Sequence, residues 1–155
     1  MRALSPGWVR VVAMRLAPLL AVSVFLIPGV CLSQSAGKTP VFQVLRPTVV
    51  AFFEPVTEAE LDKDADLNEV LSDFQWYAGK IRKPLQESGI EFHVVYARSF
   101  RIRIRNKANT FHVGNRVGYY FVTPGKKPLV QYGVDTDDDI VATARKYFGM
   151  PPVAH

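Results

Sequence analysis

The carboxylates that can do chemistry in this chain are concentrated in one acidic segment. Residues 54–73 contain eight acids and a single base, Lys63. The acids are Glu54, Glu58, Glu60, Asp62, Asp64, Asp66, Glu69 and Asp73. The three alternating aspartates have the spacing of a calcium-binding loop, in which oxygen atoms ligate the ion. However, Leu67 occupies the position where that loop needs glycine, and Asp73 replaces its closing glutamate. We therefore expect a solvated acidic segment with no metal and no cofactor.

Histidine and serine do not complete a further site. His93 shares a predicted strand face with Glu91, and His112 lies far along the chain, so the two histidines do not specify a zinc site. No serine lies in a Gly-x-Ser-x-Gly elbow, which would position a nucleophile. We expect both histidines to have structural or surface roles.

An arginine-rich strand is the main candidate for binding. Arg101, Arg103 and Arg105 alternate with apolar residues, and Arg98 precedes them. The period of two predicts a half-buried strand with a charged outer face. Arginine binds carboxylates and phosphates through paired N–H donors, so we predict that this face, together with Arg116, contacts an acidic partner. The alternative interpretation is an edge strand that its charges protect from aggregation.

The N-terminal segment has the features of a secretion signal. It contains three arginines and no acid, then an apolar stretch at 16–27, and small or polar residues as far as 35. These features predict a signal peptide over residues 1–35, with either Met1 or Met14 as the start. The apolar stretch is shorter than the ~20 residues that span a bilayer. We expect a secreted or periplasmic protein; an uncleaved anchor and a lipidated Cys31 are the alternatives.

Cys31 is the only cysteine, and it lies inside the predicted signal. The mature chain therefore has no thiol and cannot run a dithiol–disulfide cycle. Loss of the signal also removes three of the 19 bases, which leaves 16 bases against 14 acids and a net charge of about +2. This small charge argues against nucleic-acid binding.

Hydrophobic periodicity predicts one α/β domain over residues 36–155, with its core at about 48–148. The first helix has an apolar face that includes Leu67 and Val70, and Pro84 is expected to bend or break it. Residues 98–117 are predicted to form either a hairpin or a connection that contains a helix. The other expected elements are an edge strand at 41–45, a buried strand at 48–53, a helix capped by Asp66 that stops at Ser88-Gly89, a parallel strand at 90–97, a hairpin of strands at 118–122 and 128–134, and a helix that follows Asp135 or Thr136 and stops at Gly149.

This order of elements resembles the thioredoxin superfamily over roughly residues 48–148. The segment YYFVTPGKKPLVQYGVDTDDDIVATARKYF is similar to the last two strands and the final helix of a thioredoxin. The segment VVAFF resembles the strand that leads into the redox loop, and a helix with an internal proline also fits the family. The resemblance implies a three-layer sandwich with a mixed central sheet of about four to five strands flanked by helices.

The chain departs from the family at both parts of the redox site. The Cys-x-x-Cys motif would fall on Thr57-Glu58-Ala59-Glu60, and Val117 stands where the family has a cis-proline. A non-proline cis bond is unfavourable by about 3 kcal/mol, so we expect a trans bond before Val117. Thr57 and Glu60 also have the pattern of a capping box, which is the role we expect for them. No catalytic residue of the family is therefore carried over.

The sequence favours an exported, thioredoxin-like protein without thiol redox activity, which binds or scaffolds another protein, and the arginines predict that this partner is acidic. The predicted contact surface is the arginine strand with Arg116. One alternative is an enzyme that uses Glu58, Glu60 or His93 in the cleft where the family's redox site lies, although the pattern leans against an enzyme. The other is an envelope-associated protein that binds anionic surfaces through its arginines or keeps its signal in the membrane.

Overall fold

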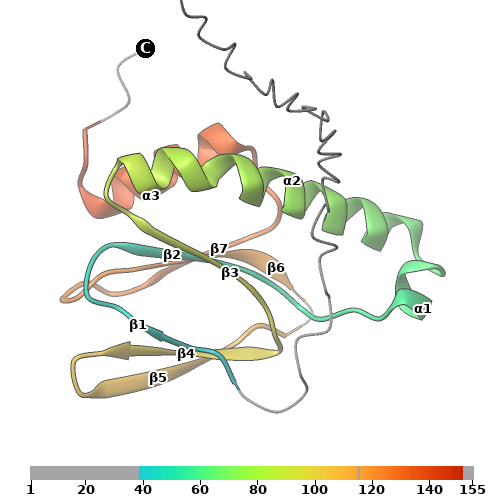
Figure 1. Ribbon diagram of the computed structural model, residues 1–155, viewed down its shortest axis with the longest axis horizontal. Helices are drawn as coiled ribbons and strands as arrows, with labels where there is room; N and C mark the ends of the chain where they lie inside the picture. The colour runs from blue at the N-terminus through green and yellow to red at the C-terminus, as the bar shows by residue number, and fades with distance from the viewer. Residues whose placement is uncertain (1–38, 115, 152–155) are drawn as a thin grey trace, which may run out of the picture. The chain divides into compact units, whose positions relative to one another are not determined.

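The computed structural model describes residues 39–114 and 116–151, which form three layers (Figure 1). Helices α2 (Ala65–Glu87) and α3 (Asp137–Phe148) form the first layer. A four-stranded sheet forms the middle layer, and a three-stranded sheet forms the last. All described residues belong to one compact unit. The predicted signal peptide, with Cys31, lies outside the described residues.

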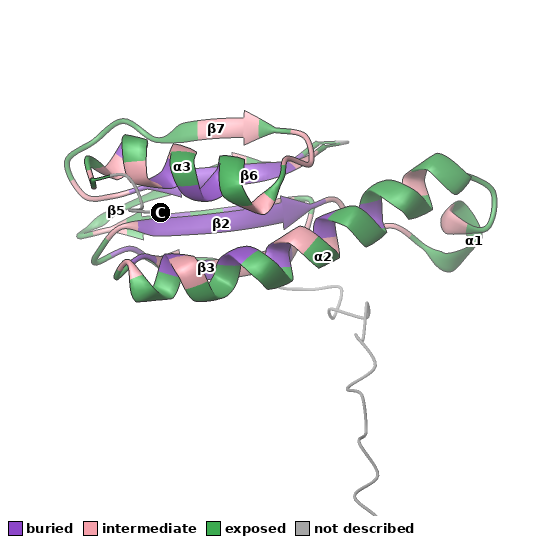
Figure 2. Cartoon of the chain, turned by 90° about the horizontal axis from the view of Figure 1, so that it is seen from above, coloured by how far each residue is buried: buried purple, intermediate pink, exposed green. Residues whose placement is uncertain are grey.

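The larger sheet has the strand order β3-β2-β6-β7. Its central strand β2 (Thr48–Phe53) is parallel to β3 (Glu91–Tyr96) and antiparallel to β6 (Val117–Val122). The edge strand β7 (Leu129–Tyr132) is antiparallel to β6. Every residue of β2 is buried, as Figure 2 shows. The predictions of a strand buried on both faces and of a parallel neighbour after the helix are both confirmed.

The smaller sheet has the order β1-β4-β5. Its central strand β4 (Ser99–Ile104) is parallel to β1 (Val41–Gln43) and antiparallel to β5 (Lys107–His112). Arg105 and Asn106 form the turn between β4 and β5. Residues 98–117 thus contain a hairpin, which was one of the two forms expected for them.

Each face of the larger sheet buries its own apolar cluster. On the helix side, Phe53 and Tyr119 pack with Phe74 of α2 and other residues of both helices. On the other side, Phe52 packs with Phe100 of the smaller sheet. Neighbouring residues of a strand point to opposite faces, so Tyr119 and Phe121 lie in the first cluster and Tyr120 lies in the second.

The third layer differs from the expected arrangement. The resemblance implied helices around the sheet, but α2 and α3 both lie on one face, and β1, β4 and β5 cover the other (Figure 1). The physical reason is the period of two in residues 99–104, which places Phe100 and Ile102 on one side of a strand and cannot form a helical stripe. The chain is therefore an α/β protein with two mixed sheets.

Helix α2 begins and continues differently from the prediction. Asp64, not Asp66, is its N-cap: the Asp64 carboxylate accepts a hydrogen bond from the Leu67 N–H at 3.0 Å. The helix also runs through Pro84 to Glu87. Leu85 is fully buried beside Pro84, and such packing against a sheet offsets one missing backbone hydrogen bond.

The last helix follows the prediction. Thr136 is its N-cap, and Gly149 ends it with a φ of 75° in the left-handed region. Of the helices in residues 39–114 and 116–151, none is both long and apolar enough to cross a membrane.

Candidate functional site

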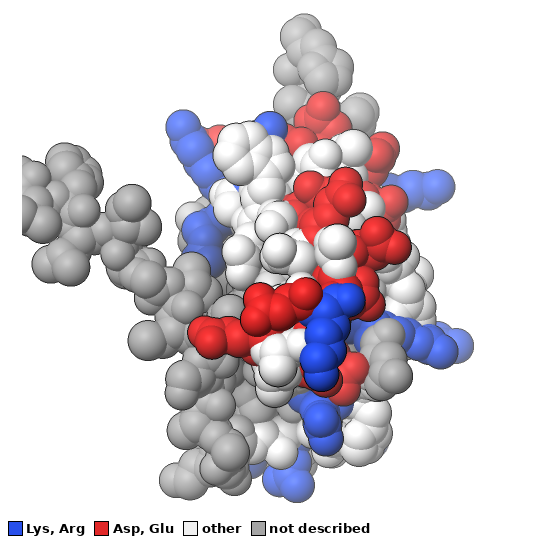
Figure 3. Space-filling model, turned by 90° about the vertical axis from the view of Figure 1, so that its right-hand side faces the viewer, with Lys and Arg blue, Asp and Glu red and all other residues white. Residues whose placement is uncertain are grey.

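The acidic segment forms the surface around α1 (Glu58–Leu61) and the start of α2 (Figure 3). Its carboxylates lie largely in solvent. Two of them cap helices: Glu60 accepts hydrogen bonds in the capping box of α1, and Asp64 is the N-cap of α2. Over the described ranges, no three His, Cys, Asp or Glu side chains are grouped closely enough to hold a metal ion. The segment is therefore a solvated surface with local capping roles.

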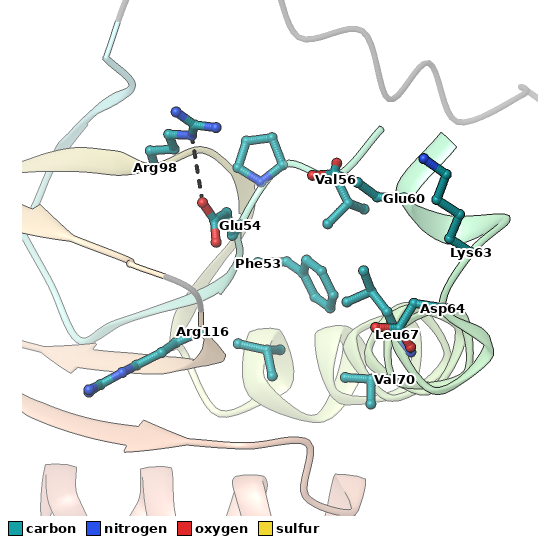
Figure 4. A pocket seen from close by; sticks show the side chains of 12 residues that line it. Phe53, Glu54, Val56, Glu60, Lys63, Asp64, Leu67, Val70, Arg98 and Arg116 are labelled. Atoms are coloured by element: carbon teal, nitrogen blue, oxygen red, sulfur yellow. Dashed lines mark hydrogen bonds and ion pairs between the residues drawn. The ribbon is translucent and has the colours of Figure 1, made fainter. Parts of the chain in front are cut away.

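A groove of about 630 Å³ lies beside this segment, at the carboxyl end of β2. Its apolar lining comprises Phe53, Pro55, Val56, Leu67, Val70 and Val117. Its charged lining comprises Glu54, Glu60, Lys63, Asp64, Arg98 and Arg116. Figure 4 shows the side chains of Phe53, Val56 and Leu67 converging on the cavity. A cavity of this size is typical of ligand sites, which span roughly 300–1,000 Å³.

The strand directions explain why distant residues meet here. Strands β2 and β3 are parallel, and β6 runs against β2. The carboxyl ends of β2 and β3 therefore lie at the same edge of the sheet as the amino end of β6. This brings Phe53, Arg98 and Val117 together although they are far apart in the sequence.

The length of α2 creates the groove. Its 23 residues extend about 35 Å at 1.5 Å per residue, whereas the six residues of β2 extend about 20 Å. The first turns of α2 therefore overhang the edge of the sheet, as Figure 2 shows. Leu67 and Val70 lie on this overhang, so their apolar side chains line an open groove instead of the core.

Thr57 and Glu60, at the position of the missing redox motif, form the expected capping box. The backbone N–H and the hydroxyl of Thr57 donate to Glu60 Oε2 at 2.7 and 2.8 Å. In return, the Glu60 N–H donates to Thr57 Oγ1 at 3.3 Å. The hydrogen bonds from Thr57, the backbone one above all, lower the pKa of Glu60. A carboxylate held ionised in this way is a poor proton donor near neutral pH.

Val117, at the position of the family's cis-proline, supplies apolar surface. It is half-buried, pairs with Phe53 across β2 and β6, and lines the groove. No peptide bond in the described residues is cis, so the bond before Val117 is trans, as expected. Glu60 and Val117 thus both line the groove, and Thr57 holds the Glu60 side chain in place through the capping box.

Two arginines border the groove in different ways. The Arg98 Nε lies 3.6 Å from Glu54 Oε1, and 83% of the Arg98 side chain is exposed. An ion pair this exposed contributes at most about 1 kcal/mol, so it can exchange for contacts with a ligand. The Arg116 guanidinium lies 4.6 Å from the centre of the Tyr132 ring. Figure 4 shows it directed away from the apolar lining.

The structure places the four predicted partner-binding arginines at two locations. Arg116 lines the groove. Arg101 and Arg103 are exposed on the outer face of the smaller sheet, and Arg105 lies in the β4–β5 turn with a φ of 52°. The sequence pattern of β4 predicted its charged face correctly but carried no information about its distance from Arg116.

Glu58, Glu60 and His93, the candidates for proton transfer, are not brought to one cavity. Glu60 lines the groove, whereas His93 lines a second cavity of about 410 Å³. His93 pairs with Val50, three residues before the end of β2. Its Nε2 lies 2.9 Å from Glu91 Oε1, and Glu91 Oε2 accepts from Arg46 at 3.2 Å. His93 therefore has the structural partner expected from its strand face.

The resemblance implied a cleft at this position, but sequence reasoning missed its apolar lining from α2. Leu67 and Val70 belong to the apolar stripe of α2, and such a stripe ordinarily predicts residues that are buried in the core. The available signal was the mismatch between a helix of more than twenty residues and a six-residue strand. Part of a long stripe cannot be covered by a short strand, so its overhanging residues stay open.

The chain matches no protein-family model, no curated protein and no solved structure. What defines it is the combination described above: an α/β protein with two mixed sheets and an open groove, with no cysteine in the part of the chain that the structure describes. Its function is therefore inferred from these residues.

Proposed function

We propose that this chain is an exported, thioredoxin-like domain without thiol redox activity, which binds an extended segment of another protein in the groove. The thioredoxin-like assignment is supported by the order of elements in the larger sheet. Helix α2 connects the parallel strands β2 and β3, and α3 follows the antiparallel pair β6 and β7. This is the strand–helix–strand and strand–strand–helix order on which the resemblance rests.

The observation that carries the binding proposal is the apolar groove at the position of the redox motif. Val56, Leu67 and Val117 are only half-buried there, and Val70 is 36% exposed. Charged residues of both signs surround these side chains. An apolar centre within a polar rim is the usual composition of a protein-binding site. Apolar side chains of an extended segment fit the lining, while its polar groups remain at the charged border.

The enzyme alternative has less support. Glu60 is held ionised by Thr57, Glu54 is paired with Arg98, and His93 lies at another cavity. A general acid or base needs a free proton site within reach of the substrate. These side chains instead have local structural partners, which favours binding over proton transfer.

Site-specific crosslinking tests the proposed function. A photoreactive phenylalanine analogue replaces Val70 in the groove or Leu129 on β7 as a matched control, since the two side chains are 36% and 39% exposed. Irradiation of the producing cells should crosslink position 70 to a protein whose linked residues form an extended segment. Position 129 should not capture that protein. Equal capture at both positions, or capture of small molecules alone at position 70, would contradict the proposal.

Export is tested by the mass of the protein recovered outside the cytoplasm. Cleavage of the predicted signal removes about 35 residues, and with them Cys31. The recovered mass should therefore correspond to a chain that begins near residue 36. An intact mass, or a mass increased by lipid on Cys31, would contradict this part of the proposal.

A further inference from the structure

The outer face of the smaller sheet is a separate surface with its own composition. Arg101 is paired with Val41 of β1 and Thr110 of β5. Arg103 is paired with Gln43 and Ala108 in the same way. Side chains of paired residues point to the same face of a sheet, and these six residues are all exposed. The two arginines therefore occupy the middle of an open sheet face.

The bases of this region have no acidic partners. The β4–β5 hairpin carries Arg101, Arg103, Arg105 and Lys107, and residues 99–116 contain no acid. Among the described residues, none of these four bases forms an ion pair, whereas Arg46, Lys83 and Arg98 each do. Their N–H donors are therefore available to an external anion, and arginine suits the oxygens of phosphate in particular.

Two exposed aliphatic side chains accompany these bases. Val41 is 53% exposed. Leu45 is 74% exposed, which is the highest value among the large apolar residues of the described chain. The Val44 N–H donates to the Arg103 carbonyl at 2.8 Å, which keeps the chain beside β4 beyond the end of β1. Val44 is buried at this point, and Leu45 follows it in the bend beyond β1 with an exposed side chain.

We propose that this face, with Val41, Leu45 and the hairpin bases, lies against an anionic phospholipid surface. The bases bind headgroup phosphates, and the two aliphatic side chains enter the interfacial layer. Surface-bound proteins commonly combine apolar burial with attraction to anionic lipid in this way. The proposal concerns a surface that is separate from the groove and does not depend on the groove being a binding site.

The composition of the face favours lipid over other anionic partners. Apart from His112, which pairs with Ser99 at the end of β5, its paired outward residues include no aromatic side chain on which nucleic-acid bases stack. Eight of the 14 acids of the chain lie elsewhere, around α1 and the first half of α2 (Figure 3). An anionic surface repels that side and attracts the hairpin, so the charge distribution itself orients the domain.

Vesicle cosedimentation of the exported protein tests the proposal. The probes are vesicles of phosphatidylcholine with phosphatidylglycerol and vesicles of phosphatidylcholine alone. The variant R101S/R103S/R105N removes three hairpin bases; asparagine is chosen at 105 because it tolerates a positive φ. The matched control K80S/K83S/K146S removes the same charge from exposed lysines of the helix layer.

The wild type should bind the anionic vesicles and lose binding as salt is raised. Each base near such a surface contributes a few-fold to partitioning, so the hairpin variant should lose about 100-fold. The control should retain most of the binding, and Leu45→Ser should weaken it several-fold. The variant R101K/R103K/R105K keeps the charge and should bind nearly as well as the wild type.

Three results would overturn the proposal. Equal losses in the hairpin and control variants would show a response to net charge alone. Equal binding to both kinds of vesicle, or none to either, would exclude anionic lipid. Tighter binding to polyaspartate or DNA than to anionic vesicles would identify a different class of partner. Val70→Arg should leave vesicle binding unchanged, which separates this surface from the groove.

Discussion

Tyr119 carries a buried hydroxyl that has no hydrogen-bond partner among the described residues. Its side chain is fully buried on the helix side of β6, and this burial, with a smaller effect of Asp135, raises its pKa far above the usual range. An unpaired buried hydroxyl destabilises a fold by roughly 1–3 kcal/mol. Tyr119→Phe keeps the packed ring, so we predict a free energy of unfolding that is unchanged or higher by about 1 kcal/mol.

Chemical denaturation checks this prediction against Tyr147→Phe. The Tyr147 hydroxyl donates to the Lys127 carbonyl at 2.9 Å, so its removal should lower the free energy of unfolding by about 1 kcal/mol. A clear loss of stability in Tyr119→Phe would show that its hydroxyl has a partner.

The Thr57–Glu60 cap predicts a dependence on acid. The pKa of Glu60 is lower in the folded chain than in the unfolded one because Thr57 donates to its carboxylate. The cap therefore stabilises α1 fully above the unfolded pKa and loses its effect as the pH falls through the folded pKa. The Thr57 amide resonance should titrate with a midpoint below the ordinary glutamate value. Glu60→Gln should abolish that titration; a midpoint at or above the ordinary value would contradict the cap.

Single residues were predictable where their role is local. The cap of Thr57 and Glu60, the left-handed stop at Gly149 and the opposite faces of Tyr119 and Tyr120 all follow from spacing within a few residues. Asp66 was wrong as the cap of α2 because two aspartates with similar patterns compete there. The choice of Asp64 depends on where α1 ends, and neighbouring residues alone do not determine that.

At the scale of elements, Gly118 limits how closely β7 approaches β6. A Cβ at Gly118 would lie 2.2 Å from the Gln131 carbonyl oxygen, which is backbone and cannot move without shifting β7. Gly118→Ala should therefore lower the free energy of unfolding by about 1–3 kcal/mol, as overpacking does. The contact lies between the two strands of a hairpin, so the local loss of stability should be largest in the edge strand β7.

Gly79→Ala is the matched control for this prediction. Gly79 lies inside α2, and a Cβ there meets nothing within 4 Å. Alanine should raise stability by about 0.5–1 kcal/mol because it favours the helix. Hydrogen exchange of the β7 amides should increase in Gly118→Ala only. Equal protection in both variants would contradict the close approach.

The elements themselves were largely predictable, but their layers were not. Periodicity predicted the long helix, the buried strand and the alternating strand of arginines, because each pattern is contained in a few turns or residues. The pairing of β1 with β4 joins segments about sixty residues apart. Nothing local indicates that pairing, so the sequence did not predict that a second sheet would cover β2. The groove also depends on long-range placement, since it forms where α2 extends past the end of β2 in the larger sheet.

At the scale of the whole molecule, three surfaces of different chemistry surround one fold. The groove lies at the carboxyl end of β2, eight of the 14 acids gather around α1 and the first half of α2, and four bases without ion pairs lie on the β4–β5 hairpin of the smaller sheet. A domain that rests on anionic lipid through its bases would keep the groove open, because no residue of the basic face lines it. The two proposals are thus compatible and can fail separately.

The most direct test of the central claim is the affinity of the wild type and two variants for the segment crosslinked at position 70. Synthetic peptide of that segment is titrated by calorimetry into the wild type, Val70→Arg and Leu129→Arg. A charge placed in the apolar lining should weaken binding by about 10-fold or more, while the equally exposed β7 position should leave it unchanged. Binding that survives Val70→Arg, or that falls equally in Leu129→Arg, would contradict a binding site in the groove.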